Sequence, residues 1–344
     1  MIDFYNLNKK ISYFLNKEDT NYKQFMNFFC KLSNDYLKEI EDCNNIFDFD
    51  DDNLKYASYE ENLSNVQDFF KQLNIDYLKS LNKMYELKQI NIKSKKSDEN
   101  YCDLKNKKPY LNISLTNSID DSFCLVHEFM HSTNLKQKIS LSREYLTESL
   151  LIFFEYLLYD YYCNIDYSNK DYYKIKIINF LSTYYNATVI NNDKTIIDFY
   201  LKNKQITFKN LKQNYSNDKE KYEEIKLMCD NYSKYYLGIF ENKKYLLGTV
   251  LACYMHQRLL VDRKFIDKIF YLNENLNSLN LMECFAIIDL NFSIKDGEYN
   301  LEDHQYNYLM YCLKKELEEI YLKCVGEFNE QSYIYCRSNR SWKN

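Results

Sequence analysis

The sequence contains few of the residues that make tight turns, because its 344 residues include one proline and four glycines. Folds built from many short strands depend on such turns, so this scarcity favours long helices. No apolar run is long enough to cross a bilayer; the most apolar stretch, 150–162, is short and contains Glu155 and Asp160. We therefore expect a mainly α-helical protein with no membrane partner.

Three further absences bear on partners and compartment. The longest basic cluster covers only residues 93–96 and the net charge is −5, so no nucleic-acid surface is expected. The eleven cysteines form no Cys-x-x-Cys pair, and the N-terminus has no basic segment followed by an apolar stretch. These features predict reduced thiols and a cytoplasmic protein.

The spacing of apolar residues predicts the order of the elements. Spacings of three and four predict amphipathic helices over 20–43 and 54–87, and alternation predicts strands at 90–92 and 110–115. Further helices are expected over 119–135, 140–162, 171–190, 193–204, 217–236, 244–272, 278–290 and 303–324. We expect one domain over 1–344, with a helical N-terminal region (1–92), a sheet with two metal-site helices (93–162) and a helical C-terminal region (163–344).

Two of the four histidines lie in the pentapeptide His-Glu-Phe-Met-His at 127–131. On a helix, His127 and His131 project from one face, where both can bind a single metal ion. Glu128 lies beside them, where a carboxylate can accept a proton from an activated water. This spacing favours a zinc site over the alternative, a solvated helix with two surface histidines.

A catalytic zinc site requires a third protein ligand. One large group of zinc peptidases has a third histidine six residues after the second, but this chain has Gln137 there. The helix expected over 140–162 offers three glutamates. We prefer Glu148 as the ligand, with Glu144 as the alternative. Glu155 lies seven residues after Glu148 on the same helical face, where it can fix a histidine tautomer.

The segments around these residues resemble a known family. Residues 108–132, from Lys-Pro-Tyr-Leu-Asn to Met-His-Ser, resemble the strand, loop and active-site helix of the oligoendopeptidase F and thimet oligopeptidase family. Residues 146–155 resemble its ligand helix, including the spacing of seven between two glutamates. Residues 99–102 resemble the segment that precedes the edge strand of the family. The resemblance covers about 98–160.

The resemblance implies one zinc ion per chain, with His127, His131 and Glu148 as ligands and Glu128 as the catalytic base. It implies a mostly helical zinc-peptidase fold, with a small sheet before the active-site helix and the metal at the floor of a substrate groove. It also implies that the strand at 110–115 is an edge strand that pairs with an extended peptide or unfolded polypeptide. The residues of this predicted substrate strand are Tyr110, Leu111, Asn112, Ile113 and Ser114.

Residues 235–251 are the counterpart of a tyrosine-rich segment in the family, whose tyrosines donate hydrogen bonds to the reacting carbonyl. Tyr245 matches one family tyrosine, whereas the other falls at Thr249. Tyr236 or Tyr235 is the candidate substitute. The resemblance therefore implies Tyr245 and Tyr236 as donors to the oxyanion.

Two residues depart from the family pattern. Met130 stands where the family has glycine, and Asn134 where it usually has histidine. The leading hypothesis is a zinc endopeptidase that cleaves peptides or unfolded polypeptides. One alternative is a specialised protease for a single protein target. The other is a binding protein that keeps the zinc and the groove without turnover, which Met130 favours and the intact Glu128 opposes.

Overall fold

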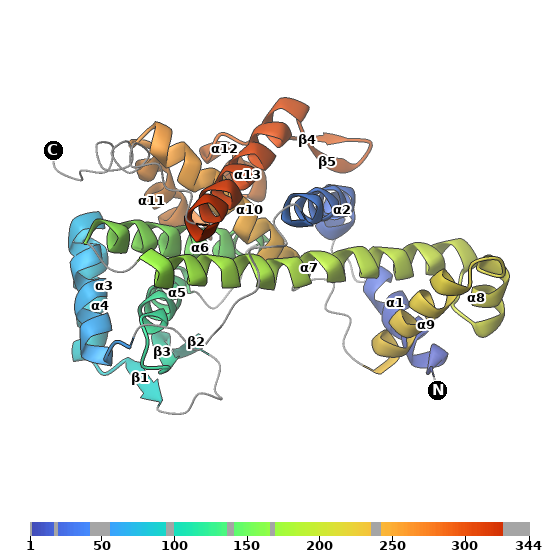
Figure 1. Cartoon of the computed structure of the whole chain (residues 1–344), viewed down its shortest axis with the longest axis horizontal. Helices are drawn as coiled ribbons and strands as arrows, with labels where there is room; N and C mark the ends of the chain where they lie inside the picture. The colour runs from blue at the N-terminus through green and yellow to red at the C-terminus, as the bar shows by residue number, and fades with distance from the viewer. Residues whose placement is uncertain are drawn as a thin grey trace. The chain divides into compact units, whose positions relative to one another are not determined.

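A computed structural model describes residues 2–16, 20–41, 56–93, 100–135, 141–165, 169–234 and 242–325. Its elements confirm the predicted mainly helical fold with a small sheet before the helix that carries the two histidines. Figure 1 shows how they are arranged within each part of the chain. The elements are α1 (Phe4–Asn16), α2 (Thr20–Glu41), α3 (Tyr59–Leu73), α4 (Ile75–Glu86), β1 (Ile90–Lys93), β2 (Tyr101–Lys105), β3 (Lys108–Ser114), α5 (Asp120–Asn134), α6 (Leu141–Asn164), α7 (Asn169–Asn203), α8 (Phe208–Asn214), α9 (Lys219–Lys234), α10 (Asn242–Val261), α11 (Phe265–Asn275), α12 (Leu281–Ile287), β4 (Phe292–Lys295), β5 (Glu298–Leu301) and α13 (Asp303–Val325).

The chain divides into two compact units. Unit 1 comprises Met1–Glu39, Thr183–Leu246 and Ser293–Asn300, and unit 2 comprises Ile40–Ser182, Leu247–Phe292 and Leu301–Asn344. The expectation of one domain over 1–344 stays a prediction. No helix in the described residues is both long and apolar enough to cross a membrane.

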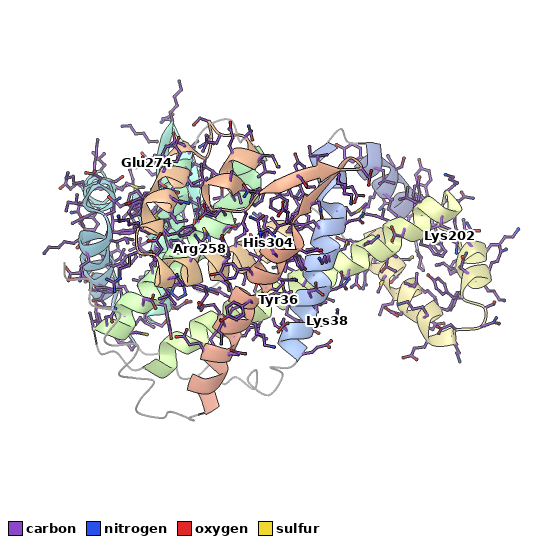
Figure 2. All side chains as sticks on the ribbon, turned by 90° about the horizontal axis from the view of Figure 1, so that it is seen from above. Tyr36, Lys38, Lys202, Arg258, Glu274 and His304 are labelled. Atoms are coloured by element: carbon purple, nitrogen blue, oxygen red, sulfur yellow. The ribbon has the colours of Figure 1, made fainter. Side chains whose placement is uncertain are left out.

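In unit 1, α1, α8 and α9 gather beside the C-terminal part of α7 (Figure 1). Their core is apolar and includes Leu7, Ile11, Ile196, Ile197, Ile206, Leu211 and Ile225. Figure 2 labels Lys202 near this end of α7. On α2, Tyr36 is fully buried whereas the Lys38 side chain is 74% exposed, as the amphipathic pattern predicts (Figure 2).

In unit 2, the sheet has the strand order β1-β3-β2. β1 runs parallel to β3, with Ile90 opposite Leu111, and β2 runs antiparallel to β3, with Cys102 opposite Leu111. β2 and β3 are joined by Asn106 and Lys107, which both have positive φ, as a two-residue type I′ hairpin requires.

The sheet order corrects the prediction of an edge strand at 110–115. Tyr110, Leu111, Asn112, Ile113 and Ser114 lie in the central strand β3, which pairs with β1 on one side and β2 on the other. Since the N–H and C=O groups of a central strand serve its two neighbours, β3 has no free edge for a peptide. The alternating pattern identified a strand but not its position in the sheet. In the described part of the chain, β2 occupies the edge nearest α5.

Several helix boundaries also differ from the prediction. The region 54–87 forms α3 and α4, which are separated by Asn74; its side chain accepts hydrogen bonds from the first N–H groups of α4. The region 244–272 forms α10 and α11, separated at residues 262–264, whereas 171–204 forms the single helix α7. The hairpin of β4 and β5 was not predicted.

Candidate metal centre

The two histidines of the pentapeptide lie on α5, which packs between the sheet and α6 (Figure 1). His127 and His131 are one turn apart, and their ring centroids lie 5.0 Å from each other. Glu148 lies on α6 and is buried. One possible ligand atom from each of these three residues lies within 4.8 Å of the others. The structure therefore brings together the three residues that the sequence predicted as zinc ligands.

The separation of His127 and Glu148 fits a tetrahedral zinc ion. His127 Nε2 and Glu148 Oε2 are 3.7 Å apart, which is too long for a hydrogen bond. Two ligands that each lie about 2.1 Å from a tetrahedral zinc ion are separated by roughly 3.4 Å. Two imidazoles and one carboxylate are also the donor set of a well-known class of catalytic zinc sites.

Glu155 lies behind His127, on the side away from Glu148. Its Oε1 is 2.5 Å from His127 Nδ1, and its Oε2 accepts a hydrogen bond of 3.0 Å from the Asn179 side chain on α7. A proton on Nδ1 that is donated to Glu155 leaves the Nε2 lone pair directed at the proposed metal position. Asn179 was not found from the sequence, because it is distant along the chain and belongs to no motif.

The charges around His127 change its protonation in the metal-free protein. Burial alone would lower the pKa of His127, but the hydrogen bond and charge of Glu155, together with Glu148 and Glu128, raise this pKa to about 9. A metal ion that binds Nε2 must therefore displace a proton over most of the neutral range.

Glu128 is buried beside the histidines, where it is 5% exposed. Burial raises its pKa to about 7, with His127 opposing this shift and Glu148 and Glu155 adding to it. The Cys102 N–H on β2 donates a hydrogen bond to this carboxylate. Among the described residues, the buried Glu128 Oε2 has no hydrogen-bond partner. This oxygen is thus available to a water molecule in the site.

Gly248 lies on α10 against the backbone of α6. A Cβ atom at this position would lie 3.1 Å from the Cβ of Glu148 and 3.2 Å from Cδ1 of Ile152. The absence of a side chain at 248 therefore permits α10 to approach α6 at the proposed ligand. A glycine inside a helix usually has a packing reason, so the sequence itself carries a signal for this position.

The C-terminal end of α5 is held by amide groups. The Asn134 side chain donates to Asn273 Oδ1 on α11, and Asn273 Nδ2 donates to Tyr77 Oη at 2.8 Å and to Thr133 Oγ1 at 3.1 Å. Asn134 thus has a structural role at the position where the family usually has histidine. Met130 is fully buried, so its side chain packs in the core of the protein.

The structure does not test the predicted roles of the tyrosines or of Glu144. Tyr245 lies in the first turn of α10, is 38% exposed and belongs to unit 1, whereas the proposed ligands belong to unit 2. Tyr236 and Tyr235 lie outside the described residues, as does the side chain of Glu144. The roles of these residues stay predictions.

Comparisons with known proteins rest on the fold. No protein-family model matches the chain, and no curated protein matches its sequence. Solved structures match it over most of its length, and they place it in the structural class of the oligoendopeptidase F and Pz peptidase fold.

Three structures represent this class. A protein described as a peptidase from Chlamydophila abortus matches 91% of this chain and 57% of its own, with a TM-score of 0.60 and 15% identity. PZ peptidase A with inhibitor 2 matches 90% of this chain and 59% of its own, with a TM-score of 0.54 and 14% identity. A protein described as oligoendopeptidase F from Bacillus anthracis strain Ames matches 78% of this chain and 48% of its own, with a TM-score of 0.50 and 16% identity. The chain thus spans about half to three-fifths of the length of these structures.

Proposed function

We propose that this protein is a zinc-dependent endopeptidase that cleaves peptides or unfolded polypeptides. The observation that supports the proposal is the convergence of His127, His131 and Glu148 from two packed helices, with ligand atoms within 4.8 Å of one another. The buried Glu128 beside them supplies a base, which a purely structural zinc site does not need. One zinc ion per chain would be bound by these three ligands.

A bound zinc ion supplies Lewis acidity, which polarises the scissile carbonyl and acidifies the attacking water. The residues of the chain carry the proton. Glu128 accepts the proton of the water as the new C–O bond forms, and then delivers it to the leaving amine as the C–N bond breaks. Glu155 keeps His127 in the tautomer that leaves Nε2 free for the metal.

The substrate is proposed to pair with β2 instead of β3. In the antiparallel pair, alternate N–H groups of β2 point away from β3, and the Cys102 N–H is directed at Glu128. The outer edge of β2 therefore faces the proposed base. A peptide that adds a strand there would bind through backbone hydrogen bonds. This mode of binding predicts broad sequence tolerance and a preference for extended segments.

The oxyanion of the tetrahedral intermediate requires a hydrogen-bond donor from the chain. Tyr245 is our first candidate and Tyr236 the second. Tyr245→Phe should lower kcat with little change in KM, because this donor acts mainly in the transition state. If Tyr236→Phe loses most of its kcat while Tyr245→Phe keeps wild-type kinetics, Tyr236 is the donor to the oxyanion.

The proposal is tested by zinc analysis of the purified chain together with cleavage of an unbiased peptide mixture and of a denatured protein. The wild type should contain one zinc ion and cleave both substrates. Glu128→Gln should keep the fold and the zinc but lose roughly two or more orders of magnitude in rate, because an amide cannot accept the proton.

The outcomes separate the proposal from its alternatives. Equal cleavage by wild type and Glu128→Gln would contradict the mechanism. Zinc and peptide binding without hydrolysis by the wild type would identify the binding protein that Met130 favours. Cleavage of one folded protein but not of the mixture would identify a specialised protease.

A further inference from the structure

A buried histidine lies at the junction of three helices in unit 2. His256 on α10 is 1% exposed. Its Nε2 lies 2.8 Å from Asp160 Oδ2 on α6, and its Nδ1 lies 2.5 Å from Glu316 Oε1 on α13. Gln257 donates a further hydrogen bond of 2.7 Å to Glu316 Oε1. We call His256, Asp160 and Glu316 the buried charge cluster.

The contacts define the charge of His256. An ionised carboxylate only accepts hydrogen bonds, so an imidazole that bonds one carboxylate through each nitrogen must donate from both and carry a positive charge. Burial alone would lower the pKa of His256, but Glu316 and Asp160 raise it to about 10. Two charge-assisted hydrogen bonds therefore connect α10 to α6 and α13 at neutral pH.

Asp160 belongs to the ridge of α6 that packs on α10. Residues 148, 152, 156 and 160 recur every fourth position and form one such ridge. Glu148 and Ile152 lie against Gly248, the Tyr156 hydroxyl lies 3.5 Å from Cys253 Sγ, and Asp160 bonds His256. The contacts advance along both helices in the same direction. α10 thus holds α6 at the proposed zinc ligand and again three turns later.

The ridge connects the buried charge cluster to the proposed metal centre. Asp160 is five residues beyond Glu155 and twelve beyond Glu148, or about 8 Å and 18 Å along the axis at 1.5 Å per residue. A helix of this length is stiff, so sliding or rotation of α6 at Asp160 would move both glutamates relative to the histidines of α5. Apolar packing tolerates such small shifts, whereas two directional ion pairs on one ring do not.

We propose that His256 is a positioning residue that fixes the register of α6 through Asp160 and Glu316, and thereby holds Glu148 and Glu155 in the geometry that binds zinc. This inference rests on the proposed function, because it assumes that Glu148 is a zinc ligand. His256 itself contacts neither metal nor substrate.

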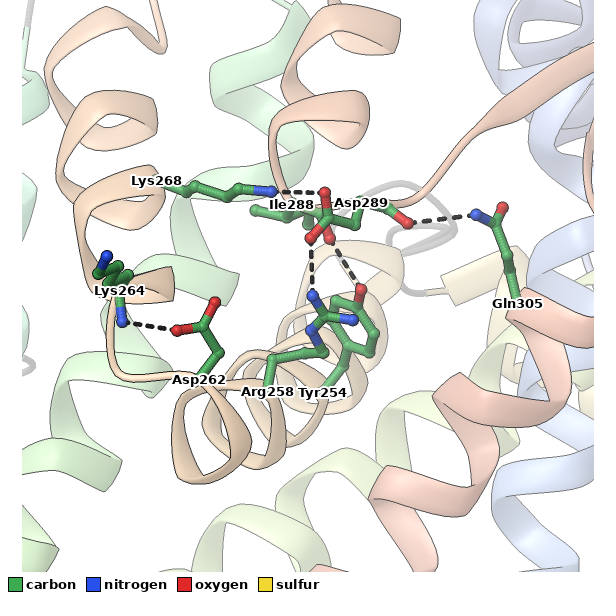
Figure 3. A network of polar contacts seen from close by, with 8 residues as sticks. All are labelled: Tyr254, Arg258, Asp262, Lys264, Lys268, Ile288, Asp289 and Gln305. Atoms are coloured by element: carbon green, nitrogen blue, oxygen red, sulfur yellow. Dashed lines mark hydrogen bonds and ion pairs between the residues drawn. The ribbon is translucent and has the colours of Figure 1, made fainter.

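The matched control lies on the opposite side of α10. Arg258 follows His256 by two residues and so points about 200° away around the helix. Figure 3 shows its ion pair of 2.8 Å with Asp289, which also pairs with Lys268. Arg258→Ala removes an ion pair that α10 makes with Asp289, which is not part of α6, so it reports the effect of a general loss of stability.

The experiment measures the zinc dissociation constant by chelator competition and the melting temperature of the metal-free form. In His256→Leu, two buried carboxylates lose their shared partner. The zinc dissociation constant should rise about tenfold, at the lower end of the range for residues that support metal ligands. Arg258→Ala should lower the melting temperature and leave the dissociation constant unchanged. If His256→Leu does not fold, Asp160→Asn provides the same comparison, since it keeps an acceptor for His256 but removes the charge on α6.

Two results would overturn the inference. The first is that the folded fraction of His256→Leu binds zinc as tightly as the wild type. Where His256→Leu does not fold, the same result in Asp160→Asn would overturn the inference. The second is an equal loss of affinity in Arg258→Ala, which would show that any destabilisation has this effect. A wild type that binds no zinc contradicts both this inference and the proposed function. A wild type that binds zinc but hydrolyses nothing contradicts the proposed activity alone, and the affinities still test His256.

Discussion

The chain contains two histidines that each face two carboxylates, and they differ at one nitrogen. At His127, Nδ1 bonds Glu155 while Nε2 stops 3.7 Å short of Glu148. At His256, both ring nitrogens bond carboxylates, at 2.5 and 2.8 Å. The first arrangement leaves one ring nitrogen and space for a metal ion, whereas in the second both ring nitrogens are bonded to carboxylates. The same residue types thus form a candidate reactive centre in one place and a structural contact in the other.

Removal of the proposed third ligand, Glu148, should give the largest difference in zinc affinity between a change at the metal centre and a change at the buried charge cluster. Glu148→Ala should weaken zinc binding by more than about 100-fold, beyond the effect of residues that only support ligands. Glu316→Gln, which keeps an acceptor for His256, should weaken zinc binding by no more than about tenfold. Zinc analysis after dialysis against a chelator distinguishes them. Full zinc retention by Glu148→Ala would instead favour Glu144 as the ligand.

Glu155→Gln should have the next largest effect. The amide still accepts a hydrogen bond from His127 Nδ1, but the substitution removes the negative charge that makes the imidazole a stronger ligand. Zinc affinity should fall roughly 10-fold, and chelator competition measures this. An unchanged affinity would mean that the 2.5 Å contact serves only to pack α5 on α6.

Gly248→Ala tests whether close packing on α6 contributes to the first centre. An alanine Cβ would lie 3.1 Å from that of Glu148, so the helices must separate at an overpacking cost of about 1–3 kcal/mol, and zinc affinity should fall severalfold. Gly297→Ala is the control, because its cost comes from a positive φ of 80° in a turn with open space. A more stable Gly248→Ala, as the helix propensity of alanine alone predicts, would contradict the close contact.

The two histidines should also differ in their response to pH once zinc is bound. Their folded-state pKa values of about 9 and about 10 exceed the unfolded value of about 6.5. Both stabilise the metal-free fold fully below pH 6.5, and this contribution disappears as pH rises through 9 and 10. Zinc replaces the proton of His127, so of these two contributions the zinc-bound form should keep that of His256 alone.

Urea unfolding between pH 6.5 and 10 measures this difference. The free energy of unfolding of the metal-free protein should decrease with pH, by on the order of 1 kcal/mol more than that of a zinc-bound sample referred to constant free zinc. Parallel profiles for the two forms would show that zinc does not bind at His127.

The sequence predicted what depends on local spacing. His127 and His131 share a face of α5, and Glu148 and Glu155 share a face of α6, because the helical period alone places them there. The mainly helical fold follows from the same pattern. Non-local contacts were not accessible: the central position of β3 depends on a parallel partner, and β2 with its charged Asp103 and Lys105 has no simple alternation. His256, Asp160 and Glu316 are separated by 60 residues or more, so no motif connects them.

The hairpin of β2 and β3 has a consequence for the order in which the protein folds. Its strands are joined by Asn106 and Lys107 alone, so their pairing closes almost no loop, whereas α10, which packs on α6 at Glu148, comes from a distant part of the chain. Local hairpins form in about 1–10 μs, and contacts between distant segments follow later. The N–H groups through which β2 and β3 pair should therefore gain protection from hydrogen exchange before α10 packs on α6, and nascent chains would present a strand-pairing surface before that contact forms.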